Sequence, residues 1–121
     1  MQIQLPTEVQ NCLNFVNNAF VPGAGEPLII HSPWNGQKIG ESRSSTKGDV
    51  DAAVSAATAA QIAWGETPIK ERTKVMFNFR EILLRDLEKI SQIVAAENGK
   101  TPLEARAGVM KGVEVLEYAI S

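Results

Sequence analysis

The chain has 121 residues, of which 44% are hydrophobic and 21% charged, and its formal net charge is −2. This composition is typical of one globular domain or a piece of one, and it excludes a disordered segment or a strongly basic nucleic-acid-binding surface. Single copies of cysteine (Cys12) and histidine (His31) exclude an internal disulfide framework and a metal site rich in these residues. No apolar run reaches the length of a membrane span and no secretory leader is evident, so we expect no membrane association and a cytoplasmic location.

The N-terminal third is expected to be a loose lead-in over residues 1–11 followed by two short β-hairpins. The first hairpin turns at Asn17-Asn18, because asparagine tolerates the positive φ that a tight hairpin turn requires. The second pairs residues 28–30 with residues 38–41 around Asn35-Gly36, a strong turn signal. Hairpins this small are marginal alone, so they need another element to pack on.

Two amphipathic helices are predicted next. Residues 46–64 carry many alanines and one apolar stripe, so a neighbouring element can approach this helix closely. Residues 67–100 place apolar side chains in steps of three and four, the helical period, and are predicted to form one long helix. Gly99 can take the left-handed conformation that ends a helix, so the predicted helix stops there.

A third amphipathic helix begins after Thr101, where Glu104 stands three residues later and completes a capping box. Its apolar stripe still runs at Ile120, and no stop signal follows. We therefore expect an α+β fragment of a longer chain, whose exposed stripes belong against a part that lies outside these 121 residues.

Read from the residues alone, the chain shows little chemistry. It contains no motif for a dinucleotide, a nucleotide phosphate, a zinc protease or a redox dithiol. Cys12 has no base nearby in sequence and His31 stands alone, so both are interpreted as structural or exposed residues. Trp34 and Trp64 are interpreted as packing anchors. No catalytic residue, cofactor-binding residue or metal ligand is predicted on this basis.

The chain nevertheless carries an ordered series of short motifs: FVNNAFV at 15–21, HSPWNG at 31–36, the helix from DVDAAV to W at 49–64, PIKER at 68–72, FNFR at 77–80, ENGKT at 97–101 and GVEVLEYA at 112–119. In this order the series resembles the start of the aldehyde dehydrogenase superfamily over about residues 13–120. Within the superfamily, FNFR, ENGKT and GVEVLEYA resemble the methylmalonate-semialdehyde dehydrogenase branch.

The resemblance implies that residues 1–121 are the N-terminal segment of an NAD-dependent dehydrogenase that oxidises a semialdehyde to an acyl-CoA or acid. The segment would belong to the cofactor-binding half and pack on the NAD-binding domain. The nucleophilic cysteine, the general base and the NAD phosphate cradle would lie further along the parent chain. The segment alone is then expected to bind no NAD and to be inactive, with the remainder of the dehydrogenase as its partner and a homo-oligomer as the assembly.

One site residue follows from the resemblance. Lys111 stands where the branch has an arginine implicated in holding the substrate carboxylate, and Gly108 stands where the branch tends to have an acidic residue. Lysine keeps the charge of arginine but loses its bidentate fork. The alternative hypothesis is a free-standing helical module that mediates interaction or oligomerisation without enzyme activity.

Overall fold

The computed structural model describes residues 3 and 5–121. It confirms short N-terminal strands followed by helices, and the described residues form two compact units. The sheet unit comprises Pro6–His31 and Gly36–Glu66, and the helical unit is built mainly from Thr67–Ser121 and the loop Ser32–Asn35. The elements, in chain order, are β1 (Gln10–Cys12), β2 (Asn14–Val16), β3 (Ala19–Val21), β4 (Pro27–His31), β5 (Lys38–Arg43), α1 (Lys47–Glu66), α2 (Ile69–Arg85), α3 (Leu87–Asn98) and α4 (Pro102–Ile120).

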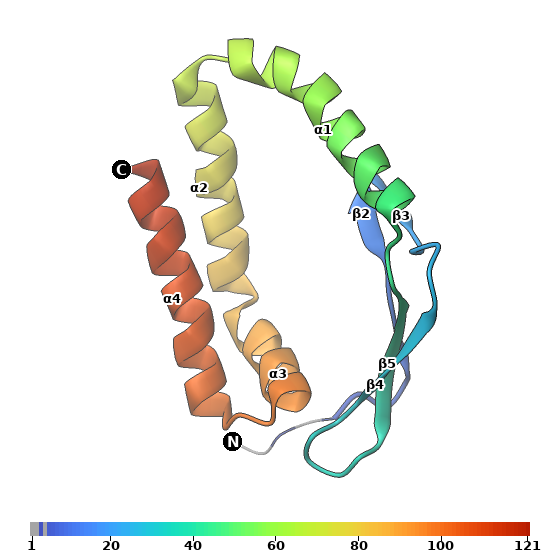
Figure 1. Ribbon diagram of the computed structural model, residues 1–121. Helices are drawn as coiled ribbons and strands as arrows, with labels where there is room; N and C mark the ends of the chain where they lie inside the picture. The colour runs from blue at the N-terminus through green and yellow to red at the C-terminus, as the bar shows by residue number, and fades with distance from the viewer. Residues whose placement is uncertain (1–2, 4) are drawn as a thin grey trace. The chain divides into compact units, whose positions relative to one another are not determined.

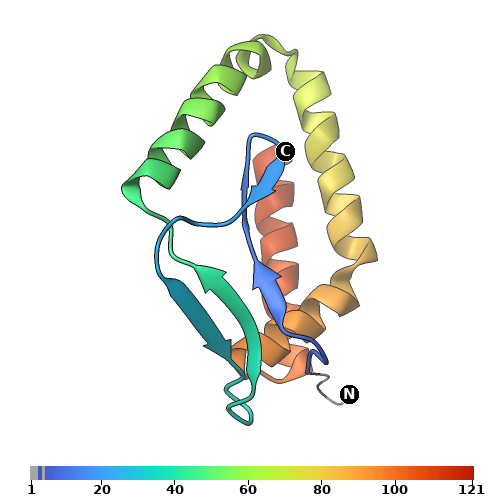
Figure 2. The same ribbon diagram turned by 90° about the vertical axis from the view of Figure 1, so that its right-hand side faces the viewer.

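The second predicted hairpin is present and belongs to a three-stranded sheet of order β1-β5-β4. β4 runs antiparallel to β5 and β1 runs parallel to it, as the arrows in Figure 2 show. Residues 10 and 11 were expected in a loose lead-in, and the structure corrects this, because both belong to β1. Positions 1, 2 and 4 of that lead-in lie outside the described residues. Ile39 of β5, with 3% of its surface exposed, is the buried apolar side chain of this sheet.

The first predicted hairpin is β2–β3, and its turn is the asparagine pair. Asn17 and Asn18 adopt φ angles of 49° and 60°, as a tight hairpin turn requires. Phe15 and Phe20 face each other across the strands, with their ring centroids 5.0 Å apart. This cross-strand aromatic pair stabilises a hairpin whose hydrogen-bonded length is only three residues.

Helix α1 begins with a reciprocal hydrogen-bonded cap. The backbone N–H of Thr46 donates to Asp49 Oδ2 at 2.7 Å, and the N–H of Asp49 donates to Thr46 Oγ1 at 3.3 Å. Asp49 Oδ2 also accepts the N–H of Ala24 at 3.0 Å, which ties the loop after β3 to the start of the helix. The helix continues through Gly65 to Glu66, and none of its residues is buried.

The predicted long helix over 67–100 is wrong as a single element, because it is divided at Asp86 into α2 and α3. Asp86 has φ −99° and ψ 10°, outside the α-helical region, and Arg85 forms two hydrogen bonds to its carboxylate at 2.9 and 2.8 Å. Aspartate is a poor helix-interior residue, which makes it a suitable site for the change in direction visible in Figure 1. The chain thus has four helices among the described residues instead of the expected three.

The core of the helical unit lies where α3 meets α4, and α2 packs along α4 as well. The break at Asp86 turns one face of α3 inward, and Val113 of α4 is 1% exposed. The predicted capping box at Thr101 and Glu104 is confirmed, and Gly99 ends α3 with φ 70°. The buried residues of α3 and α4 are Leu87, Ser91, Ala95, Ala96, Ala105 and Val113.

Candidate functional site

Lys111, the one site residue named from the sequence, lies in the middle of α4 with 77% of its side chain exposed. Its Nζ donates to Oε2 of Glu114 at 2.5 Å, one helical turn further along. This hydrogen bond and the charge attraction behind it raise the pKa of the Lys111 ammonium above its ordinary value. Lys111 is therefore a persistently charged, solvent-facing cation that already holds one carboxylate.

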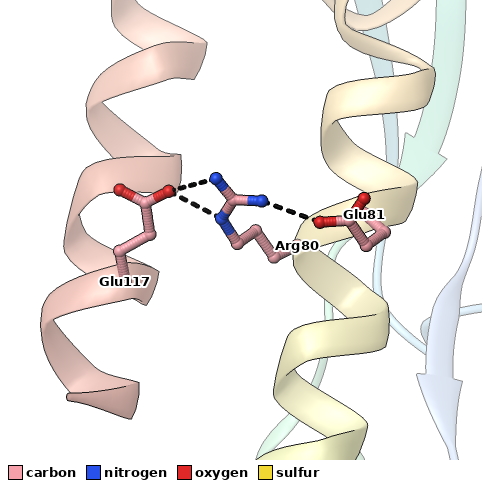
Figure 3. Close-up of polar contacts among 3 residues, drawn as sticks. All are labelled: Arg80, Glu81 and Glu117. Atoms are coloured by element: carbon pink, nitrogen blue, oxygen red, sulfur yellow. Dashed lines mark hydrogen bonds and ion pairs between the residues drawn. The ribbon is translucent and has the colours of Figure 1, made fainter.

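Two elements fix the orientation of the helix that carries Lys111. At its start, the hydroxyl of Thr101 and the carboxylate of Glu104 complete the capping box. At its end, Arg80 of α2 reaches across to α4, where Nε and Nη2 both lie 2.6 Å from Oε1 of Glu117 (Figure 3). Nη1 of Arg80 donates to Glu81 at 2.7 Å, so the guanidinium is held from both sides.

A second ion pair joins α3 to α4 nearer to the start of α4. Nε of Arg106 donates to Oε1 of Glu88 at 2.8 Å. Together with the Arg80–Glu117 contact, this pair holds α4 against both of its neighbouring helices. The buried contacts of Ala105 and Val113 lie on the opposite face of α4 from Lys111, so the helix is anchored on one side and open on the other.

The tryptophan loop is the part of the β4–β5 connection that joins the helical unit. Nε1 of Trp34 donates to the carbonyl oxygen of Ala95 at 3.0 Å, and Ser32 is 2% exposed. A Cβ placed on Gly99 would lie 3.0 Å from Pro33, so glycine is required there by space as well as by its positive φ. Trp34 is therefore a packing and hydrogen-bonding anchor for the end of α3.

The other two residues singled out in the sequence, Cys12 and His31, belong to the sheet unit. Cys12 is an exposed free thiol that lines a pocket of about 230 Å³, together with Glu41 and Arg43. His31 is exposed at the end of β4. Across the part of the chain that the structure describes, no three histidine, cysteine or acidic side chains are grouped as a metal site would require.

Two contacts of this arrangement are not among the sequence predictions. The Arg80–Glu117 pair spans 37 positions, and no local pattern marks it. The Lys111–Glu114 pair could be inferred from the sequence, because residues three apart on a helix are neighbours and opposite charges there attract.

None of the helices in the described part of the chain has both the length and the apolar character needed to span a bilayer.

The comparisons with known proteins agree with the resemblance seen in the sequence. A model of the aldehyde dehydrogenase family matches residues 20–121. Malonate-semialdehyde dehydrogenase 1 of Geobacillus kaustophilus is 35% identical over 107 residues, which is 88% of this chain and 22% of the relative. The acylating methylmalonate-semialdehyde/malonate-semialdehyde dehydrogenase of Rattus norvegicus mitochondria is 32% identical over 108 residues, or 88% of this chain and 20% of the relative.

Solved structures agree with the fold. A Sinorhizobium meliloti 1021 protein assigned as a methylmalonate-semialdehyde dehydrogenase and complexed with NAD has a TM-score of 0.89 at 27% identity, over 96% of this chain and 24% of that one. The NAD-dependent benzaldehyde dehydrogenase of Corynebacterium glutamicum has a TM-score of 0.85 at 26% identity, over 90% and 24%. The chain thus spans about a quarter of the length of the proteins it matches. It belongs to the aldehyde dehydrogenase family.

Proposed function

We propose that these residues are the N-terminal part of an NAD-dependent aldehyde dehydrogenase that oxidises a malonate-type semialdehyde to an acyl-CoA or acid. The observation that carries the proposal is the run of relatives named for malonate or methylmalonate semialdehyde, which match 88–97% of this chain at 31–35% identity. Such substrates carry a carboxylate beside the aldehyde. The open face of α4 presents a cation, Lys111, that can pair with it.

The residues of this chain do not fit the cofactor itself. A pyrophosphate cradle needs glycines that open backbone N–H groups to a ligand. Gly23 and Gly25 are the most closely spaced glycines here, and a Cβ on either would lie 2.6 Å from the carbonyl oxygen of Arg43 or Ser44. These glycines therefore serve a close approach of two chain segments. We assign NAD binding, the nucleophilic cysteine and the general base to the remainder of the parent protein.

The role we propose for the segment is structural. Its helices would pack against the cofactor-binding domain, and the alanine-rich helix α1, which has no buried residue, supplies apolar surface for that purpose. By itself the 121-residue chain would be inactive and bind no NAD. The full protein would be a cytoplasmic homo-oligomer, and the exposed free thiol of Cys12 is compatible with a reducing compartment.

The decisive experiment is kinetic and uses the full-length protein that carries these residues. We expect NADH formation with malonate semialdehyde, and we expect Lys111→Ala to raise the KM for it while leaving the KM for propanal, which lacks the carboxylate, much less affected. Lys89→Ala removes another lysine of the helical unit and is the matched control. Equal effects of Lys111→Ala on both aldehydes would refute the assignment of Lys111 as the carboxylate site, and a lack of NADH formation with malonate semialdehyde would refute the substrate assignment.

The rival function, a free-standing helical interaction module, rests on the exposed apolar side chains of the helical unit, among them Phe77, Ile69 and Leu103. The intact mass of the protein made from its native gene separates the two. A mass near 13.1 kDa would favour the module, whereas a mass several-fold larger would favour the dehydrogenase.

A further inference from the structure

The outward face of α4 places a carboxylate of this chain on the ammonium that the proposed substrate would use. Lys111 and Glu114 are 77% and 55% exposed, and Val113, which lies between them in sequence, is 1% exposed on the opposite face. The 2.5 Å contact between Nζ and Oε2 is therefore made on the open side of the helix. Within the described residues both side chains remain mostly exposed, so an incoming carboxylate can replace this contact.

There is room beside Lys111 for such a ligand. Gly112 follows it directly and Gly108 lies one turn earlier, and in the part of the chain that the structure describes a Cβ on either glycine would meet no atom within 4 Å beyond its chain neighbours and the nearby backbone of its own helix. Glycine is unfavourable inside a helix relative to alanine. Two glycines that no neighbour in the described structure requires leave the backbone around the ammonium uncovered.

We infer that Glu114 is a positioning residue that sets the affinity of the site for a carboxylate-bearing aldehyde, because its own carboxylate occupies Lys111 until the substrate displaces it. The inference rests on the proposed function. The exchange makes and breaks no covalent bond: one carboxylate replaces another on the same ammonium. Lysine suits this exchange, since it is a point charge with three rotatable donors on a flexible stem. Its raised pKa keeps it charged throughout.

The size of the effect follows from the exposure of the pair. Exposed ion pairs have a small interaction free energy. Releasing Lys111 from such a pair therefore corresponds to about a two- to fivefold gain in its affinity for another carboxylate. The measured quantity is the ratio of kcat/KM for malonate semialdehyde to kcat/KM for propanal in the full-length enzyme. We expect Glu114→Gln to raise this ratio about two- to fivefold through a lower KM for the semialdehyde.

Three further variants distinguish competition from a general structural effect. Glu114→Asp keeps the charge and is expected to restore a ratio close to the original. Glu97→Gln removes a carboxylate at the end of α3 and is the control for the change in net charge. In a Lys111→Ala background, Glu114→Gln should no longer raise the ratio, because the ammonium for which the two carboxylates compete is gone. Glu114→Ala serves as the second variant if the glutamine substitution fails to fold.

The outcomes separate the two levels of the argument. If Lys111→Ala lowers the ratio but Glu114→Gln and Glu114→Ala leave it unchanged or lower it, the inference about Glu114 is wrong and the proposed function stands. If Glu114→Gln raises the ratio equally with and without Lys111, competition for that lysine is also refuted. If Lys111→Ala leaves the ratio unchanged, or neither aldehyde is oxidised, the assignment of the site fails and this inference fails with it.

Discussion

Replacing Val113 by alanine tests whether the contact of α4 with its neighbours is the core of the helical unit. Val113 is 1% exposed, so the substitution removes two fully buried methyl groups. At about 0.8 kcal/mol each, their transfer contributes about 1.6 kcal/mol, and the cavity left behind raises the expected loss to about 2–3 kcal/mol. The free energy of unfolding of the 121-residue chain, measured in urea by circular dichroism, gives this loss directly.

Val115→Ala is the matched control, because it makes the same chemical change two residues further along the same helix. Val115 is 67% exposed, so we expect a change within about 0.5 kcal/mol. Both substitutions gain the same helix propensity, and their difference therefore isolates the burial of Val113. The reasoning is refuted if the two variants lose equal stability, or if Val113→Ala lowers the urea slope, which would indicate a change in the native or denatured ensemble.

The remaining predictions concern the tryptophan loop, the cap of α1 and the exposed apolar side chains. Trp34→Phe keeps an aromatic ring but loses the N–H donated to Ala95, so we expect a loss of about 1 kcal/mol in the same urea assay; no loss would show that the hydrogen bond is dispensable. The N–H groups of Ala24 and Thr46 and the Thr46 hydroxyl hold the pKa of Asp49 below its ordinary value of 3.8. The stabilisation by these hydrogen bonds is fully present above the ordinary pKa and is lost as pH falls through the lower folded pKa. Asp49→Asn should therefore weaken the dependence of the urea midpoint on acidification. An unchanged dependence would contradict the role of Asp49 as the titrating cap of α1. The isolated chain should bind an apolar dye or self-associate in a sedimentation experiment, and a compact monomer that binds no dye would count against this expectation.

Several features predicted correctly from the sequence depend on four residues or fewer. The turn at Asn17-Asn18, the capping box from Thr101 to Glu104 and the left-handed Gly99 each depend on a residue type and its immediate neighbours. Their physical causes are positive φ, unpaired N–H groups and the absence of a Cβ. Such causes are present in the sequence itself, whatever the chain packs against.

The errors arose where distant residues decide the structure. β1 pairs with β5, so that Gln10 is opposite Gly40, and no turn signal announces a parallel partner thirty positions away. The break at Asp86 leaves the apolar steps of three and four intact, since Leu83 and Leu87 are four apart on either side of it. The apolar periodicity of the sequence therefore predicts one continuous helix, although the packing of α3 on α4 favours a change in helix direction at Asp86.

The candidate site shows the same division. Lys111 was named through the resemblance, and its partner Glu114 was readable from their spacing on the helix. The contact between Arg80 and Glu117, which joins α2 to α4, required the fold to be known first. The surroundings of a ligand at Lys111 depend on both contacts. The Lys111–Glu114 pair sets the local charge, and the Arg80–Glu117 pair holds the helix in place.

Helix α2 bears on why the segment would need the rest of a dehydrogenase. Leu84 is half-buried on this helix, which packs along α4. Val75, Phe79 and Ile82 recur at i, i+4 and i+7 and form a second stripe, whose members are 46–51% exposed. A helix that is apolar on two sides requires two neighbours to remove those sides from water. This chain supplies one of them, and relatives about four times as long have the residues to supply the other.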